Sequence, residues 1–265
     1  RADGSVPPGG GRTALGQTGL ALLPFLADGE SSRTGDRPER VVAHGIAWLR
    51  GQLFADNASV RSEAPAQELG MALRALSEDY MLSYGHLAPG EAARRAVELG
   101  TLAGMVERAQ RDDGSFPGSE ADVRAAVWPM WGLEAAVRTG AIQAPEQVPL
   151  RFRRWYVASD RGDPAVAAAG LLLYRELGES FFPDARDHAT QVLAHAGPSD
   201  ADPFLALTAG TGLLLTDADA FRTWNAELGE RLLNALDARG MVRQGDEVGD
   251  TALHLLALQA AYRTY

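Results

Sequence analysis

The sequence contains no cysteine, and it contains no lysine, so that all 25 basic residues are arginines. Without cysteine the chain has no disulfide, no thiolate zinc site, no iron–sulfur cluster and no cysteine nucleophile. The absence of cysteine does not identify the cellular compartment, because an oxidising environment permits disulfides but does not require them. The use of arginine alone, with abundant alanine and glycine, is typical of a GC-rich genome.

Long apolar runs and excess positive charge are also missing. No apolar run approaches the roughly 20 residues that a membrane-spanning helix needs, and we expect no signal peptide. The net charge of −10 argues against a general affinity for nucleic acid or anionic membranes. We therefore expect a soluble domain without a transmembrane segment. Because the first residue is Arg1 and not methionine, we also expect the chain to be part of a longer protein or a processed form of one.

Hydrophobic residues recur at helical spacing along most of the chain, and no segment shows the alternation of a half-buried strand. Residues 1–12, rich in glycine and proline, are interpreted as a flexible lead-in, and residues 13–265 as a single domain. The expected helices cover residues 14–26, 38–54, 66–80, 89–110, 122–137, 146–158, 165–177, 183–195, 204–215, 219–238 and 250–262. Residues 80–87 are expected to be irregular.

These helices alternate between two kinds. About six are apolar on nearly every side and must be covered by other helices, and about five have one polar face. Each pair takes 40–55 residues, which is the period of helical repeat arrays. Placing the apolar helices inside and the amphipathic ones outside predicts an all-α fold, an α/α toroid of about six inner–outer pairs, one of which lacks its outer helix.

The expected helix 89–110 illustrates an outer helix. Its buried face is predicted to consist of Val97, Leu99, Leu102 and Val106. Its solvent face is predicted to consist of Glu91, Arg94, Arg95, Glu98, Glu107 and Arg108.

The turn that follows this helix carries a motif. The sequence Gln110-Arg-Asp-Asp-Gly114-Ser-Phe116 resembles the turn signature Gln-x-x-x-Gly-x-Trp/Phe of the terpenoid cyclase and protein prenyltransferase β-subunit superfamily, which includes squalene–hopene cyclase-like repeat proteins of bacteria. Segments 122–136 and 250–262 resemble the inner helices of that family, whereas 236–240 keeps only the glycine of the turn signature. The resemblance implies an α/α toroid from a bacterial protein, in the cytoplasm or the periplasm.

Class II cyclases of this family protonate an alkene with the central aspartate of Asp-x-Asp-Asp. The nearest match is Asp200-Ala-Asp202-Pro203, so the resemblance implies that Asp202 is the acid, with His195 or His254 near it. Such an acid needs a raised pKa in a dry cavity. The other interpretation is that Asp202 caps a helix that begins with proline, as the pair Asp163-Pro164 does. The recurrence of this pair favours the cap.

The zinc site of the prenyltransferases is the second family signature. Asp122 corresponds to the aspartate ligand, but Arg124 stands where the family has cysteine. His254 lies near the place of the histidine ligand, one helical turn after Asp250, and the two side chains would suit a metal or a proton relay. Two ligands without a third make a poor site, so a buried histidine bonded to its carboxylate neighbour is favoured. We expect no metal and no cofactor.

Three further groups of side chains are candidates for binding. Trp128 and Trp131, one helical turn apart, would line an apolar cavity or stack on sugars, or else pack in the core. The cluster 151–156, with three arginines, would bind a pyrophosphate or a lipid head group, or form a solvated helix face. Tyr84 and His86 would serve a carbohydrate lyase as base and acid.

The sequence thus favours a non-catalytic α/α-toroid domain that binds a hydrophobic, isoprenoid-like ligand or a protein partner. The first alternative is a cyclase-like enzyme that uses Asp202 as its acid, and the second is a carbohydrate lyase or hydrolase on the same fold.

Overall fold

The computed structural model describes residues 1, 3–9, 11–33, 37–54, 64–119, 122–177, 185–197, 202–235 and 247–259. These residues form eleven α-helices and one 3-10 helix, and the β structure among them is limited to one isolated bridge between Gly9 and Arg12. The predicted all-α fold is confirmed. The helices are α1 (Ala14–Ala27), α2 (Arg37–Leu53), α3 (Ala66–Ser83), η1 (Tyr84–His86), α4 (Pro89–Ala109), α5 (Arg124–Arg138), α6 (Gln147–Ala158), α7 (Pro164–Leu177), α8 (Ala185–Ala196), α9 (Pro203–Thr216), α10 (Ala218–Ala235) and α11 (Glu247–Gln259).

The chain divides into two compact units. Unit 1 consists of Arg1–Arg111 with Phe116–Glu146, and unit 2 of Asp112–Ser115 with Gln147–Tyr265. Unit 1 therefore contains α1 to α5, and unit 2 contains α6 to α11. Closure of the helix pairs into one ring stays a prediction.

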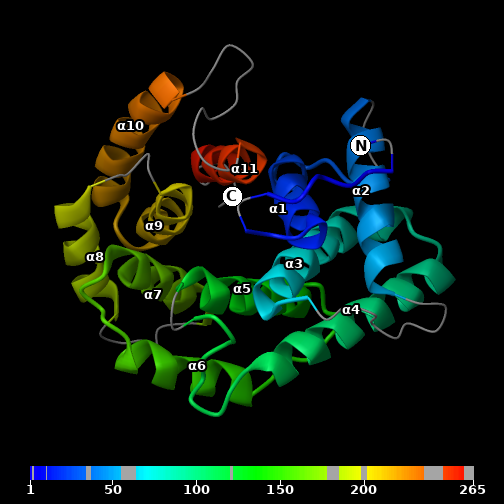
Figure 1. Ribbon diagram of the computed structural model, residues 1–265, viewed down its shortest axis with the longest axis horizontal. Coiled ribbons are helices and arrows are strands. Elements are labelled where there is room, and N and C mark those ends of the chain that lie inside the picture. The colour runs from blue at the N-terminus through cyan, green and yellow to red at the C-terminus, as the bar shows by residue number, and fades with distance from the viewer. Residues whose placement is uncertain are drawn as a thin grey trace. The chain divides into compact units, whose positions relative to one another are not determined.

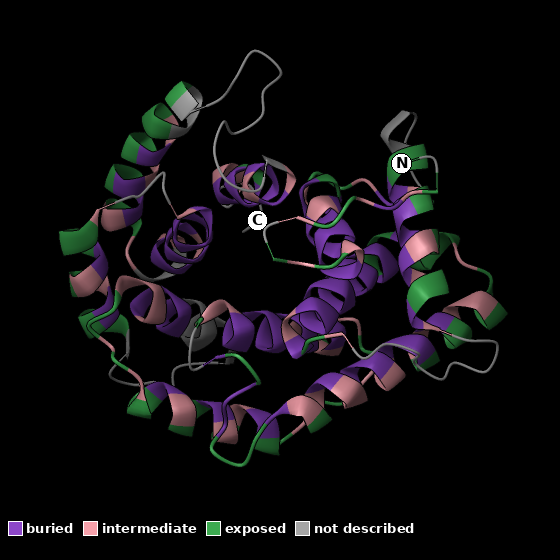
Figure 2. Ribbon diagram, in the orientation of Figure 1, coloured by how far each residue is buried: buried purple, intermediate pink, exposed green. Residues whose placement is uncertain are grey.

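In unit 1, helix α3 packs against α1 on one side and α5 on the other, while α4 and α2 also contact it (Figure 1). The helices α1, α3 and α5 are buried over most of their length, whereas α2 and α4 each have an exposed face (Figure 2). The alternation of apolar and amphipathic helices in the sequence therefore corresponds to inner and outer positions within this unit.

Glycines allow the inner helices of unit 1 to approach closely. A Cβ on Gly70 of α3 would lie 2.6 Å from the backbone nitrogen of Pro129, and a Cβ on Gly132 of α5 would lie 2.5 Å from the carbonyl oxygen of Gly70. Real Cβ atoms do not approach backbone so closely, since packed interiors leave no such overlap. The backbones of α3 and α5 therefore touch, and neither glycine has room for a side chain.

Helix α1 is capped by a side chain from α3. The Glu68 carboxylate accepts hydrogen bonds from the backbone nitrogens of Thr13 (2.9 Å) and Gly16 (3.2 Å) and from the Thr13 hydroxyl. It thereby satisfies amides at the first turn, where helix backbone donors lack partners, and places a negative charge at the positive end of the helix dipole. Because Glu68 lies in the first turn of α3, both helices start at the same end and run parallel.

Residues of the expected lead-in 1–12 also pack onto unit 1. The backbone nitrogen of Val6 donates to the Thr18 hydroxyl at 2.9 Å, and Ser5 is buried. Gly4, with a φ of +87°, lies against the backbone of His44 and Gly45. These contacts join the first residues to α1 and α2.

The predicted faces of α4 are wrong in three places. Arg95 and Glu98, expected on the solvent face, are buried, and Val97, expected in the core, is 58% exposed. The buried residues are Arg95, Glu98, Leu99, Leu102, Ala103 and Val106, which follow one stripe at helical spacing. Position on the helix therefore decides burial here, and the two charged residues on the stripe are neutralised by ion pairs described below.

The irregular segment predicted at 80–87 is also largely wrong. Helix α3 continues to Ser83, and the 3-10 helix η1 follows at once. The extension has a physical reason, since the Ser83 hydroxyl donates to the Asp79 carboxylate one turn earlier, at 3.3 Å, inside the unit.

In unit 2, helix α9 packs against α7 and α11 (Figure 1). Helix α8 packs against α7, and helix α10 packs against α9. The segments 165–177 and 204–215, predicted as apolar helices, are helical, and their described residues are largely buried (Figure 2). Asp163 caps α7 through the backbone nitrogen of Ala165 at 2.7 Å, as its Asp-Pro pair predicts.

The turn motif contributes a close backbone contact to unit 2. Gly114 has a φ of +92°, a backbone angle that residues other than glycine rarely adopt. A Cβ at this position would overlap the carbonyl oxygen of Arg151 in α6. Phe116, the last residue of the motif, is fully buried. The segment 236–240, which was compared with the same signature, lies outside the described residues.

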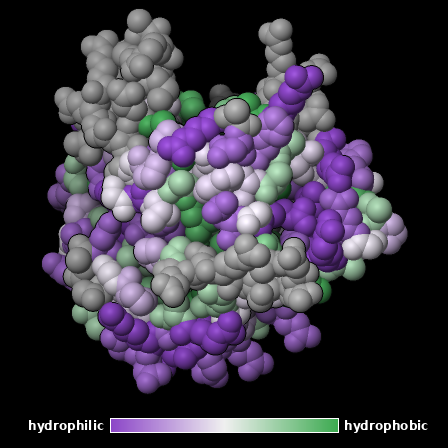
Figure 3. All heavy atoms as spheres, turned by 45° about the vertical axis from the view of Figure 1, so that its right-hand side comes forward, coloured by the Kyte–Doolittle hydropathy of each residue, from purple (hydrophilic) through white to green (hydrophobic). Residues whose placement is uncertain are grey.

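Hydrophilic residues cover most of the described surface on the face drawn in Figure 3. None of the helices that the structure describes is long and apolar enough to span a lipid bilayer.

Candidate functional site

Helix α3 buries charged side chains as well as apolar ones. The sequence predicts only the apolar content of this helix, yet Glu68, Arg74, Glu78 and Asp79 are all buried. Burying a charge is costly unless it is paired and hydrogen-bonded. The partners of each group therefore show which side chains the fold itself uses and which keep unused hydrogen-bonding capacity.

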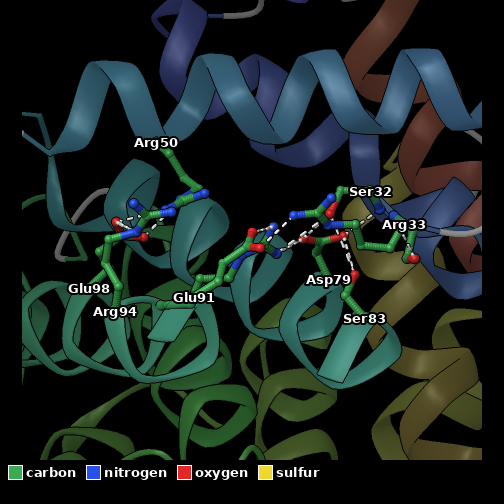
Figure 4. A network of polar contacts seen from close by, with 10 residues as sticks. Ser32, Arg33, Arg50, Asp79, Ser83, Glu91, Arg94 and Glu98 are labelled. Carbon is green, nitrogen blue, oxygen red and sulfur yellow. Dashed lines mark hydrogen bonds and ion pairs between the residues drawn. The ribbon is translucent and has the colours of Figure 1, made fainter. Parts of the chain in front are cut away.

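Asp79 is fully engaged by the fold. Its carboxylate accepts from the backbone nitrogen of Ser32 (2.6 Å), the Ser32 hydroxyl (2.8 Å), the Ser83 hydroxyl (3.3 Å) and Nη1 of Arg95 (2.8 Å) (Figure 4). These bonds tie the segment after α1 and the outer helix α4 to the inner helix α3. Asp79 is thus an anchor between helices.

Two further ion-pair groups extend this network along α4. Arg50 of α2 donates from Nε and Nη2 to the two oxygens of Glu98, each at 2.8 Å, and this bond raises the pKa of Arg50 (Figure 4). Glu91 accepts hydrogen bonds from Arg33 at 2.5 Å and from Arg95 at 2.9 Å. Both bonds lower the pKa of Glu91, and the bond from Arg33 has the larger effect. The two-point Arg50–Glu98 pair fixes the position of α2 against α4.

A small recess lies between these groups. Its polar lining comes from Arg50, Asp79, Tyr80, Arg95 and Glu98, and burial raises the pKa of Tyr80. The recess has room for about one water molecule. It is therefore too small for an organic substrate, and the network around it has a structural role.

A different situation exists on the side of α3 that faces α5. Arg74 donates from Nε to Glu78 at 3.0 Å, and its Cζ lies 4.2 Å from the ring centroid of Trp131. Trp131 in turn contacts Trp128, with ring centroids 5.2 Å apart. The Arg74 guanidinium is therefore held in place by an ion pair and by the face of an indole ring.

Three buried donors on α3 and α5 have no hydrogen-bond partner among the described residues. They are Nη1 of Arg74, the hydroxyl of Ser77 and Nε1 of Trp131. The three residues are 8%, 0% and 3% exposed. A buried donor without an acceptor costs about 1–3 kcal/mol, so native proteins keep few of them. We call Arg74, Ser77 and Trp131 the donor cluster.

The donor cluster is the candidate site of the described chain. Of its members, the sequence predicts Trp131 as a ligand-binding residue, together with Trp128, and the structure brings these two rings into contact. Arg74 and Ser77 are missed. The available signal is a charged pair, Arg74 and Glu78, one turn apart on a helix that packs against the apolar helices α1 and α5.

Asp202, the candidate acid, caps α9. Its Oδ1 accepts from the backbone nitrogens of Phe204 and Leu205, both at 3.1 Å, and its backbone is extended. The cyclase hypothesis requires that this carboxylate point into a cavity and not bond these amides. The observed geometry is that of the capping interpretation.

Replacing Asp202 therefore distinguishes a cap from an acid. We expect Asp202→Ala to lower the free energy of unfolding by about 1 kcal/mol, and Asp202→Asn to change it by only a few tenths, because asparagine caps helices as well as aspartate does. Urea denaturation of the two variants measures this difference. Equal destabilisation by alanine and asparagine would mean that the charge matters and the cap does not.

The other predicted residues of unit 1 do not join the donor cluster. Asp122 is exposed, and its Oδ1 accepts from the backbone nitrogen of Arg124 at 2.9 Å. Tyr84 and His86 lie in η1 and are exposed, and the Tyr84 ring packs edge-on against Tyr80 at 5.5 Å. Their positions are those of surface residues around turns.

The remaining candidates lie in unit 2. His254 is 3% exposed and partly exposed Asp250 precedes it by one turn of α11, so both keep the relation that the sequence predicts. His195 is exposed, with Nδ1 2.7 Å from the carbonyl oxygen of Gln191. In the cluster 151–156, Phe152 and Tyr156 are buried while the arginines at 153 and 154 are exposed, which is the pattern of a solvated outer helix.

Tyr156 of this cluster lies with its ring against Gly170 of α7. Burial raises the pKa of Tyr156 to about 12. Within the ranges that the structure describes, no three histidine, aspartate or glutamate side chains are grouped so that they could hold a metal ion.

Comparison of the chain with protein-family models and with curated proteins finds no match.

Proposed function

We propose that this chain is a non-catalytic helical domain that binds a hydrophobic ligand at the α3–α5 face, through the donor cluster and the Trp128–Trp131 pair. The observation that carries the proposal is a contrast among the buried polar side chains of α3 and α5. Asp79 and Glu68 are engaged by several hydrogen bonds each, whereas the donor cluster holds three buried donors that the described fold does not use.

The positions and hydrogen bonds of the candidate catalytic side chains support binding over catalysis. Asp202 is engaged by two backbone amides, while Tyr84 and His86 are on the surface. A general acid needs to reach the reacting atom within hydrogen-bond distance. The likeness to the cyclase and prenyltransferase superfamily, and with it a closed toroid, belongs to this proposal and rests on the turn motif and the alternation of helices.

Binding is tested with delipidated protein that is incubated with a bacterial lipid extract and analysed by native mass spectrometry. We expect discrete mass increments from bound lipid in the wild type and in the control Trp155→Phe, whose indole lies on the outer helix α6. The increments should be reduced in Trp131→Phe. An extract that leaves the wild-type mass unchanged at all concentrations would refute the proposal.

The non-catalytic part is tested separately. Farnesyl diphosphate and squalene should remain unconverted by the wild type. Turnover of either compound that is abolished by Asp202→Asn would contradict this part and restore the cyclase alternative, because this variant keeps the cap and removes the acid.

A further inference from the structure

We infer that the ligand carries an oxygen acceptor group, such as a carboxylate or an ester, on an apolar body, and that this group is bound by the donor cluster. The inference rests on the proposed function and specifies its ligand class. It follows from the chemistry of the three unused groups, because the guanidinium and the indole nitrogen can only donate hydrogen bonds and the hydroxyl can donate one.

The fold places the three donors on one side of the α3–α5 pair. Arg74 and Ser77 are three residues apart on α3 and therefore lie on neighbouring positions of one helix face. Trp131 is on α5, whose backbone touches α3 at Gly70 and Gly132, and its ring lies beneath the Arg74 guanidinium. The Arg74 guanidinium and the Trp131 ring, which come from two helices, are thus held close together.

The charges around the cluster select against a cationic ligand. Glu78 already accepts from Nε of Arg74, and Nη1 of the positively charged guanidinium keeps no acceptor among the described residues. An ammonium group has three donors and no acceptor, so it would repel Arg74 and leave all three donors unsatisfied. An acceptor oxygen, in contrast, receives charge-assisted hydrogen bonds.

The apolar part of the ligand has adaptable neighbours. Met71 precedes Arg74 by three residues and Met81 follows Ser77 by four, which places both on the same side of α3 as the donors. Met71 is buried and Met81 is 40% exposed. Methionine side chains adjust to irregular apolar shapes, so Met71 and Met81 would repack around the apolar body of a ligand.

Three probes that share a twelve-carbon chain test the inference: dodecanoate, methyl dodecanoate and dodecylammonium, each below its micelle concentration. Isothermal titration calorimetry measures their affinities. We expect the carboxylate or the ester, or both, to bind roughly tenfold or more tightly than the ammonium. The test is stringent, because the net charge of −10 favours the ammonium in any unspecific association.

Variants tie the preference to the donor cluster. Arg74→Gln and Trp131→Phe should each reduce the preference for the acceptor probes, whereas Arg94→Gln, an arginine with a largely exposed side chain on α4, should retain it. Circular dichroism and thermal denaturation show that each variant folds. If Trp131→Phe fails to fold, Ser77→Ala takes its place.

The outcomes separate the two proposals. Equal binding of ammonium and carboxylate, or an acceptor preference that survives both Arg74→Gln and Trp131→Phe, overturns the inference but leaves a hydrophobic-ligand domain. Failure of all three probes together with bound lipid from the extract also overturns the inference alone. Failure of the probes and of the extract overturns the proposed function as well.

Discussion

Replacing Gly132 with alanine is expected to lower the free energy of unfolding by about 3 kcal/mol or more, although alanine is the better helix former. The added Cβ would lie 2.5 Å from the carbonyl oxygen and 3.0 Å from the Cα of Gly70. Both obstacles are backbone atoms and cannot rotate away. Helices α3 and α5 must separate, and every contact along this inner pair loosens.

Chemical denaturation measures the effect, and Gly51→Ala is the matched control. Gly51 is also within a helix, but it is exposed and a Cβ there would have no neighbour within 4 Å. We expect this control to stabilise the protein by about 0.5–1 kcal/mol through helix propensity. If Gly132→Ala proves as harmless as Gly51→Ala, the backbone contact between α3 and α5 is wrong.

Replacing Gly114 with alanine is expected to be similarly severe, about 3 kcal/mol or more. Two costs combine at this position. A φ of +92° is unfavourable for alanine, and the Cβ would overlap the carbonyl oxygen of Arg151 at the same time. This predicts that the glycine of the turn motif positions the turn against α6.

Gly118→Ala separates the two costs, because Gly118 has the same φ of +92° and a Cβ there would make only an ordinary contact with Ala125 at 3.5 Å. We expect about 1–2 kcal/mol for this control, the cost of the backbone conformation alone. The excess at Gly114, measured by the same denaturation experiment, is the part due to Arg151. Equal losses at the two glycines would contradict the close contact.

The helices are predictable from the sequence because hydrophobic spacing, caps and turn glycines agree with one another. Asp163-Pro164 and Asp202-Pro203 mark the starts of α7 and α9, and both aspartates cap as their pattern predicts. The faces of α4 were less predictable. Arg95 is predicted to be exposed because arginine is a charged residue. It is buried because it lies on the buried stripe of α4 and pairs with Asp79.

The candidate site shows the same limit. Trp131 is identifiable from the sequence because large aromatic residues on an apolar helix either pack or bind. Arg74 and Ser77 are not, since their importance depends on which hydrogen bonds the fold leaves unmade, and a partner such as Trp131 is more than fifty positions away in the chain. Only the close contact of α3 and α5 brings these groups together.

The most direct test of the account is the NMR signal of the Trp131 indole N–H. The chain has five tryptophans, so ¹⁵N-labelled indoles give few resonances, and Trp131→Phe assigns the one that matters. We predict that dodecanoate or methyl dodecanoate shifts this resonance downfield, as a new hydrogen bond to the indole does, while dodecylammonium leaves it in place. A Trp131 resonance that remains unmoved at saturating concentrations of both acceptor probes would contradict the account.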